Sequence, residues 1–208
     1  MPHQFSTLTF TPSVKEVQTE MGSRRAGEML NQRGPENDRL GPDERRYISL
    51  RDGFYMATVT ESGWPYIQFR GGPQGFLQVV DDKTIAFADV TGNRQYISTG
   101  NLKANPRVAL FLMDYVSQSR LKILGEAEII PWSEAGDWKE QLALPDRSKP
   151  ERVVRIQVAA FDWNCPQHIP QRWTADELRY TEFGQRLHAL EIENRQLRDA
   201  LIVQASKP

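Results

Sequence analysis

Polar residues in the middle of the chain have types and a spacing suited to binding an anionic ligand. The run PYIQFR alternates between two faces if it forms a strand. Tyr66, Gln68 and Arg70 would then share one face, and Ile67 and Phe69 would share the other. Two polar groups, Gln68 and Arg70, would therefore point the same way from a structured backbone.

The strand is expected to open into a loop at Gly71-Gly72-Pro73. Glycine weakens a strand, and proline lacks the amide donor that a sheet requires. Such a loop lets the backbone approach a ligand closely.

A second polar cluster follows the run TIAFAD, which predicts a strand ending at Asp89. The turn TGNR comes next, and a short helix is expected to begin near Gln95. The first amides of a helix are unpaired and the helix dipole is positive there, so this geometry suits an anion. Arg94 would add a bidentate, permanently charged partner for phosphate. In the alternative interpretation, Asn93 and Arg94 only cap and solvate a turn.

Four motifs, PYIQFRGGP, DVTGNRQ, NPRVALF and RLKILGEAE, follow one another at separations that resemble the pyridoxamine 5'-phosphate oxidase-like family of FMN-binding split barrels. The resemblance covers residues 52–128. Members of that family are homodimers that bind FMN at the subunit interface. The resemblance implies a mainly β (α+β) fold, an FMN-binding split β-barrel with peripheral helices. A long C-terminal helix is expected in addition, from the residue spacing described below.

The resemblance also implies roles for individual residues. Gln68, Phe69 and Arg70 match the strand that contacts the flavin, and Asn93 and Arg94 match the pair that grips its phosphate. From a later strand, Arg120 falls near a polar residue that contacts the flavin ring; a shift of one or two residues would bring Lys122 there instead. The implied cofactor-binding residues are Gln68, Phe69, Arg70, Gly71, Asp89, Asn93, Arg94, Gln95, Arg120 and Lys122. No catalytic residue and no metal ligand is assigned.

At three places the sequence departs from the oxidase pattern. Gln95 stands where the family has a phosphate-binding lysine, and Gly71-Gly72-Pro73 replaces a Leu-Leu-Lys whose lysine helps to bind pyridoxal. The carboxy-terminal substrate motif is replaced by FDWNCPQHIPQRW. We therefore expect FMN binding but not vitamin B6 oxidation.

Composition limits the class of protein. The chain has 208 residues, 39% of them hydrophobic and 25% charged, and a formal net charge of -1. There is no basic field of the kind that nucleic-acid binders use, and no apolar run of the ~20 residues needed to span a membrane. With one cysteine, Cys165, no intrachain disulfide is possible. The first residues have no secretory pattern, so a cytoplasmic location is expected.

The elements predicted from the sequence fall into three regions. Residues 1–41 are expected to hold a helix over 13–22, begun by a Ser13–Glu16 capping box, and then a loop. Residues 42–173 should form the barrel domain, with an entry helix at 42–52 and closely spaced strands that favour an antiparallel barrel over a doubly wound parallel sheet. The predicted strands are FYMATVT, PYIQFR, GFLQVV, TIAFAD, RVALFLMDY, RLKILGEAEII and RVVRIQVAAFDW. A helix over WSEAGDWKEQLAL interrupts them, and its Trp132, Trp138 and Leu142 are expected to pack on the barrel.

The third region, residues 174–208, predicts one long helix that begins with a Thr174–Glu177 capping box. Its apolar residues are spaced alternately by four and three, as in a heptad repeat with Asn194 at one of the a positions. The a positions are Leu187, Asn194 and Leu201, and the d positions are Phe183, Leu190 and Leu197. This seam predicts either a parallel coiled-coil contact in a dimer or a helix packed on its own barrel.

The segment Cys165-Pro166-Gln167-His168 offers a thiol and an imidazole. No second cluster of Cys or His completes a metal site, so we expect no chemistry at Cys165. His168 and Trp173 are instead candidates for lining the flavin pocket from a loop.

Function is expected to rest on the cofactor, because no residue in the sequence demands the role of acid, base or nucleophile. The leading hypothesis is a homodimeric FMN-dependent oxidoreductase that acts on an unidentified small substrate. One alternative is a flavin-binding protein without turnover, for sensing, storage or electron relay. Another keeps the barrel but uses a deazaflavin or haem.

Overall fold

The computed structural model describes residues 3–142, 144, 149–163 and 167–205, which divide into two compact units. The first unit comprises Met1–Asp114 with Ser119–Gln167, and the second Tyr115–Gln118 with His168–Pro208. Of the described helices, none combines the length and the apolar character needed to cross a bilayer.

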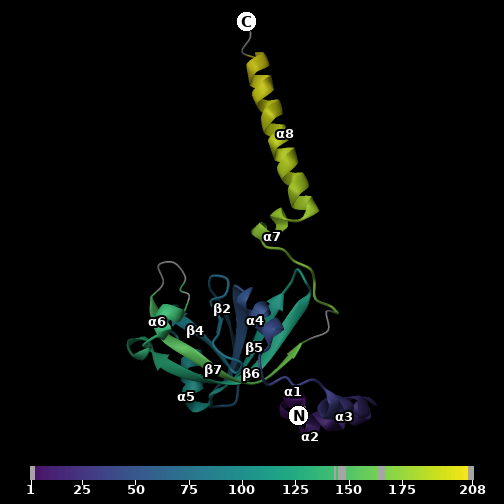
Figure 1. The fold of residues 1–208 in the computed structure, drawn as a ribbon, viewed down its shortest axis with the longest axis vertical. Coiled ribbons are helices and arrows are strands. Elements are labelled where there is room, and N and C mark those ends of the chain that lie inside the picture. Colours follow the sequence, from purple (N-terminus) through teal and green to yellow (C-terminus); the bar gives the residue numbers. More distant parts are fainter. Residues whose placement is uncertain (1–2, 143, 145–148, 164–166, 206–208) are drawn as a thin grey trace. The chain divides into compact units, whose positions relative to one another are not determined.

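The first unit is built on one antiparallel sheet of seven strands, with the order β2-β1-β5-β6-β7-β4-β3. The strands are β1 Gly53–Val59, β2 Pro65–Gly71, β3 Gln78–Val79, β4 Thr84–Val90, β5 Arg107–Asp114, β6 Ser119–Pro131 and β7 Pro150–Trp163. The sheet is strongly curved (Figure 1). Its edge strands β2 and β3 are not hydrogen-bonded to each other, so the barrel is open on that side. The predicted mainly β split-barrel fold is thereby confirmed.

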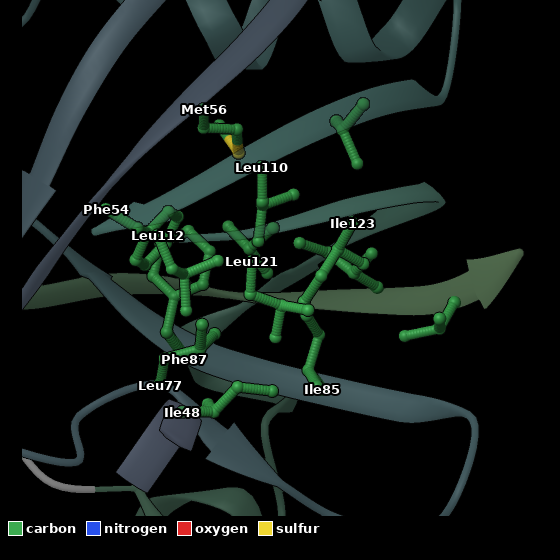
Figure 2. Packing of buried hydrophobic residues seen from close by; sticks show 14 of the residues in the cluster. Ile48, Phe54, Met56, Leu77, Ile85, Phe87, Leu110, Leu112, Leu121 and Ile123 are labelled. Carbon is green, nitrogen blue, oxygen red and sulfur yellow. The ribbon is translucent and has the colours of Figure 1, made fainter. Parts of the chain in front are cut away.

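Side chains on the inner face of the sheet form the core. Phe54, Phe76 and Phe87 are in mutual ring contact, with centroids 5.4 to 6.3 Å apart. Branched residues from four strands and two helices belong to the same cluster, and Figure 2 shows these side chains converging on one another. Alternate residues of β1, β5 and β6 are buried, as expected for strands with one face on a core.

One helix precedes the first strand of the sheet, and another connects β4 to β5. Helix α4, Pro42–Ser49, lies where the entry helix was predicted. Of the three residues expected to face the core, Tyr47 and Ile48 do so, whereas Leu50 at the helix end is 46% exposed. Helix α5, Ile97–Ala104, follows β4. The expected helix at residues 132–144 is limited to a 3-10 turn, Trp132–Glu134, and α6, Trp138–Gln141, because Gly136 between them has φ of +52°. Leu142 is buried nonetheless, with Trp132 and Trp138 packed against its cluster, as predicted.

The amino-terminal region corrects two predictions. Its helices are α1 Gln4–Thr9, α2 Pro12–Glu20 and α3 Arg24–Arg33. Helix α3 lies within residues 22–41, where a loop was expected. Helix α3 buries only Gly27, so it has no apolar period for the sequence to reveal, and good helix formers with an Arg24–Glu28 ion pair sustain it. Helix α2 lies where a helix was predicted, but it starts with Pro12 and lacks the expected capping bond.

Two further predictions need correction, in the third strand and at the C-terminus. Strand β3 is limited to Gln78–Val79, because Gly75 before it has φ of +78°. The C-terminal helix is divided into α7, Ala175–Arg179, and α8, Glu182–Ala205. The predicted Thr174–Glu177 capping box starts α7. The Thr181 hydroxyl then accepts a hydrogen bond of 3.0 Å from the amide of Gly184 and begins the second helix.

Candidate functional site

Gln68 and Arg70 lie on the inner face of edge strand β2. They are opposite Met56 and Phe54 of β1, which are fully buried, and directly opposed residues share a face. The alternation predicted for PYIQFR is therefore confirmed. Its apolar residues are on the outside, however: Ile67 and Phe69 are 62% and 57% exposed.

A carboxylate on β4 joins β2 to the far part of the sheet. Asp89 Oδ1 lies 2.6 Å from Arg70 Nη1, and its Oδ2 lies 3.4 Å from Arg152 Nε of β7. Burial raises the pKa of Asp89, and the charges of Arg70 and Arg152 oppose that rise. One buried carboxylate is thus shared between two guanidinium groups.

The turn between β4 and α5 has an unusual backbone. Arg94 and Tyr96 adopt left-handed conformations with φ of 60° and 54°, which non-glycine residues rarely do. The Asn93 side-chain oxygen accepts a 3.2 Å hydrogen bond from the Gln95 amide, an Asx turn that holds this shape. Tyr96 is the N-cap residue of α5. The turn therefore delivers Arg94 and the first amides of α5 to the same place.

Glu151, at the start of β7, is the second carboxylate of the site. It accepts hydrogen bonds from the hydroxyls of Tyr96, at 3.1 Å, and Thr91, at 3.2 Å, and it pairs with Arg152. Partial desolvation works to raise the pKa of Glu151, but these hydrogen bonds and the Arg152 charge outweigh it and lower the pKa. Glu151 is therefore ionised at neutral pH.

Residues of α5 fasten the site to β2 and β7. The Ser98 hydroxyl donates a 3.1 Å hydrogen bond to Gln68 Oε1, and Arg152 Nη1 donates one of 2.6 Å to the Thr99 hydroxyl. Arg152 also stacks on the Tyr96 ring, with Cζ 4.9 Å from the centroid. These contacts fix the start of α5 beside the polar face of β2.

Together these segments line a pocket at the open side of the sheet. The lining residues are Tyr66, Gln68, Arg70, Asp89, Val90, Gly92, Asn93, Arg94, Gln95, Tyr96, Ile97, Ser98, Thr99 and Glu151. Six of the ten residues predicted from the sequence belong to it: Gln68, Arg70, Asp89, Asn93, Arg94 and Gln95. Sequence reasoning missed Tyr96, Ser98, Glu151 and Arg152. Tyr96 and Ser98 could have been suggested by their closeness to Arg94 in the chain. No signal in the sequence pointed to Glu151 and Arg152.

The other four predicted residues lie outside the pocket lining. Phe69 packs against Tyr55 on the outer face of the sheet, at a centroid distance of 5.4 Å, and Gly71 follows at the end of β2. Arg120 and Lys122 flank buried Leu121, so they also face outward. Within one chain, the structure does not bring them to Gln68 and Arg70.

Arg120 and Lys122 have different surroundings. The Arg120 guanidinium lies 5.5 Å from the Phe111 ring centroid, and its Nε is buried without a hydrogen-bond partner in the described part of the chain. Lys122 Nζ is 2.6 Å from Asp162 and 4.9 Å from the Phe5 ring centroid. Of the two, Arg120 retains more capacity to donate to a ligand.

The donors of the pocket fit an anionic group such as a phosphate. Arg94 is exposed, and its hydrogen bond to Tyr96, at 3.3 Å, uses Nε rather than either Nη group. The first amides of α5 add unpaired donors and the positive end of the helix dipole. The Nε of Arg70 is buried and has no partner among the described atoms. Asp89 and Glu151 are already paired with Arg70 and Arg152, so they repel an incoming anion less than free carboxylates would.

Other predicted candidates belong to the second unit or lie outside the described residues. His168 and Trp173 are exposed residues of the second unit, and His168 has φ of +66°. Cys165 lies outside the described residues.

Several solved structures resemble part of this chain. HupZ from Group A Streptococcus is 19% identical, with 64% of this chain and 99% of that one covered and a TM-score of 0.46. A proposed pyridoxamine 5'-phosphate oxidase from Lactobacillus delbrueckii is 20% identical, with 60% and 94% covered and a TM-score of 0.47. An FMN-binding protein from Syntrophomonas wolfei is 12% identical, with 74% and 97% covered and a TM-score of 0.44.

No curated protein sequence matches the chain. The family model described as pyridoxamine 5'-phosphate oxidase matches residues 43–165, which is more than half of the 208 residues and includes every strand of the sheet. The chain therefore belongs to the pyridoxamine 5'-phosphate oxidase family.

Proposed function

We propose that the protein is a homodimeric FMN-binding oxidoreductase. The observation that carries the proposal is the pocket at the open side of the sheet, where Arg94 and the start of α5 present anion donors beside the polar face of β2. Family membership supports a flavin as the ligand, and the phosphate of FMN matches the anion donors.

Each part of the pocket would have its own task. Arg94 and the α5 amides would hold the phosphate, with Asn93 and Gln95 fixing the turn that aims them. Gln68 and Arg70 would bind and orient the polar edge of the flavin ring. When bound, the flavin itself supplies the redox chemistry, by accepting and passing on electrons. The protein's part is positioning and electrostatic tuning.

The outer face of the sheet supports a homodimer. Ile67, Phe69 and Tyr55 are 62%, 57% and 37% exposed and lie on adjacent strands at the sheet edge. An apolar group of this kind on a sheet face is suited to a protein interface. Because Phe111 and Arg120 lie on the same outer face, a second copy docked there would meet Arg120. We propose that Arg120 serves the flavin site of the partner.

The proposed reaction moves electrons from a reduced nicotinamide or another reduced carrier to a small acceptor. Pyridoxal oxidation is not proposed, because Gly71-Gly72-Pro73 replaces the segment whose lysine helps the family's oxidases to bind pyridoxal, and FDWNCPQHIPQRW replaces their carboxy-terminal substrate motif. A second candidate function is flavin binding without turnover. The pairing of Asp89 and Glu151 with arginines favours it, because neither carboxylate is free to act as a base.

Absorbance and binding measurements test the proposal. The protein should bind FMN and show flavin bands at ~370 and ~450 nm, which belong to the cofactor. FMN should bind more tightly than riboflavin, which lacks the phosphate. Folded protein that binds neither compound would overturn the proposal. Steady oxidation of NADH or NADPH by the FMN-loaded protein, with a dye acceptor, would favour the oxidoreductase over the second candidate.

A further inference from the structure

Helix α8 carries an apolar seam on its exposed surface. The helix has 24 residues, Glu182–Ala205, and its seam residues are all exposed: Phe183 67%, Leu187 44%, Leu190 44%, Leu197 59% and Leu201 64%. A depression along the helix is lined by Leu187, Leu190, Glu191, Asn194, Arg195 and Arg198. We propose that this seam binds the α8 seam of a second copy of the chain, with the two helices parallel and in register.

Charges beside the seam carry the argument for a second copy. With Leu187 at an a position, Arg186 and Glu193 occupy g positions, while Glu191 and Arg198 occupy e positions. In a parallel in-register pair, a g residue lies beside the e residue of the next heptad in the other helix. Arg186 would therefore meet Glu191 of the partner subunit, and Glu193 would meet the partner's Arg198. Both pairs are attractive, and twofold symmetry repeats each one.

The antiparallel arrangement is less favourable for the same residues. If two full-length seams overlapped antiparallel, a positions would face d positions, so Asn194 would lie against a leucine with its amide unpaired. Glu191 would then lie beside the partner's Glu191, and Glu193 beside the partner's Glu193, so that like charges would meet. In the parallel pair, by contrast, Asn194 meets its own counterpart, and the two side-chain amides can hydrogen-bond.

Disulfide trapping in the full-length chain tests the orientation and register. In a Cys165→Ser background, Leu190→Cys places a thiol at a d position, which faces its counterpart only in a parallel in-register pair. Ile192→Cys, two residues away at an f position, is the matched control, because Ile192 is also 44% exposed. We expect Leu190→Cys to cross-link at least ~10-fold faster under mild oxidation, since proximity raises the effective thiol concentration. Equal rates would overturn the proposal.

Charge reversal tests the flanking pairs. Added to the Leu190→Cys protein, Arg198→Glu should slow cross-linking roughly 5- to 30-fold, because two attractive pairs become repulsive. Adding Glu193→Arg should restore the rate. Arg195→Glu, the same change at a b position, should leave the rate within about twofold, although it places a like charge four residues after Glu191. If Arg195→Glu slowed the reaction as much as Arg198→Glu, or if Glu193→Arg gave no rescue, the assigned pairing would be wrong.

The outcome is independent of the flavin. Cross-linking reports on α8 whether or not FMN is bound, so a negative result would leave the proposed function standing. Conversely, a protein that fails to bind FMN could still show the α8 pair. Circular dichroism of each variant would verify that α8 remains helical.

Discussion

Arg70 on β2 and Asp89 on β4 form an ion pair of 2.6 Å across the open side of the sheet. The two strands are not hydrogen-bonded to each other: β2 is one edge, and β4 is next to the other edge. A side-chain ion pair therefore links two strands that backbone hydrogen bonds do not connect. The cofactor pocket that we propose lies along this junction.

Replacing the shared carboxylate should destabilise the barrel. Asp89→Asn leaves the nearly buried guanidiniums of Arg70 and Arg152 without their common counter-charge. We expect the free energy of unfolding to fall by roughly 2–4 kcal/mol in urea titrations. Asp82→Asn is the control, because Asp82 pairs with Arg39 at the exposed surface and should contribute less than about 1 kcal/mol. Equal effects of the two changes would show that Asp89 has no special role.

Arg94 should determine the preference for FMN over riboflavin. Losing a charge-assisted contact to phosphate costs on the order of 2–4 kcal/mol, so Arg94→Ala should weaken FMN binding roughly 30- to 1,000-fold. Riboflavin affinity should change far less, which fluorescence titration can measure. Arg107→Ala, an exposed arginine at the start of β5, provides the charge-matched control. If Arg94→Ala weakened both ligands alike, the phosphate site would lie elsewhere.

A charge on the outer face of β2 should dissociate the proposed barrel dimer. Ile67→Asp places a carboxylate in the apolar group that we assign to the interface, while the 62% exposure of Ile67 means that the monomer should still fold. Sedimentation over a concentration series should show a weaker dimer, and FMN affinity should fall with it, because the two equilibria are linked. Val17→Asp, at a 55% exposed valine on α2, should change neither. An unchanged dimer constant for Ile67→Asp would refute this interface.

The β6–β7 bulge should require glycine at position 125. The strand register shifts between Leu124 and Gly125, and a Cβ at Gly125 would lie 2.5 Å from the Gln157 carbonyl oxygen. Gly125→Ala should therefore destabilise the protein by roughly 2–4 kcal/mol. Gly100 on helix α5 is the matched position, because a Cβ there would meet no atom within 4 Å. Gly100→Ala should therefore stabilise the protein by up to about 1 kcal/mol. Thermal denaturation of both variants would compare them.

Tyr47 should make the protein sensitive to alkaline pH. Burial raises the pKa of Tyr47 to about 12, and its hydroxyl donates a 2.9 Å hydrogen bond to the Ser119 carbonyl. Above pH ~10 the unfolded chain loses the Tyr47 proton, while the folded protein keeps it until about pH 12. Stability should therefore fall by up to ~2–3 kcal/mol across this range. Tyr47→Phe should show a smaller fall between pH 10 and 12 in urea titrations, and an identical pH profile would contradict the assignment.

Local patterns in the sequence determined much of the fold and part of the site. Strand alternation and turn residues, including the turn that we propose binds an anion, are properties of neighbouring residues, so PYIQFR and TGNRQ could be interpreted directly. The same patterns predicted the seven strands and helix α4. Helix α3 was missed because helix propensity and the Arg24–Glu28 ion pair stabilise it, without an apolar stripe.

Contacts between distant segments decided the rest. Periodicity shows that Ile67 and Phe69 share a face, but only the packing of β1 and β2 in the sheet shows that this face is the exposed one. Glu151 and Arg152 reach the site because β7 pairs with β4, some sixty residues earlier in the chain, and their charges complete the environment of Asp89. The direction of a side chain is set locally, whereas its surroundings are set by whichever strands become its neighbours on folding, and short-range spacing carries no record of that choice.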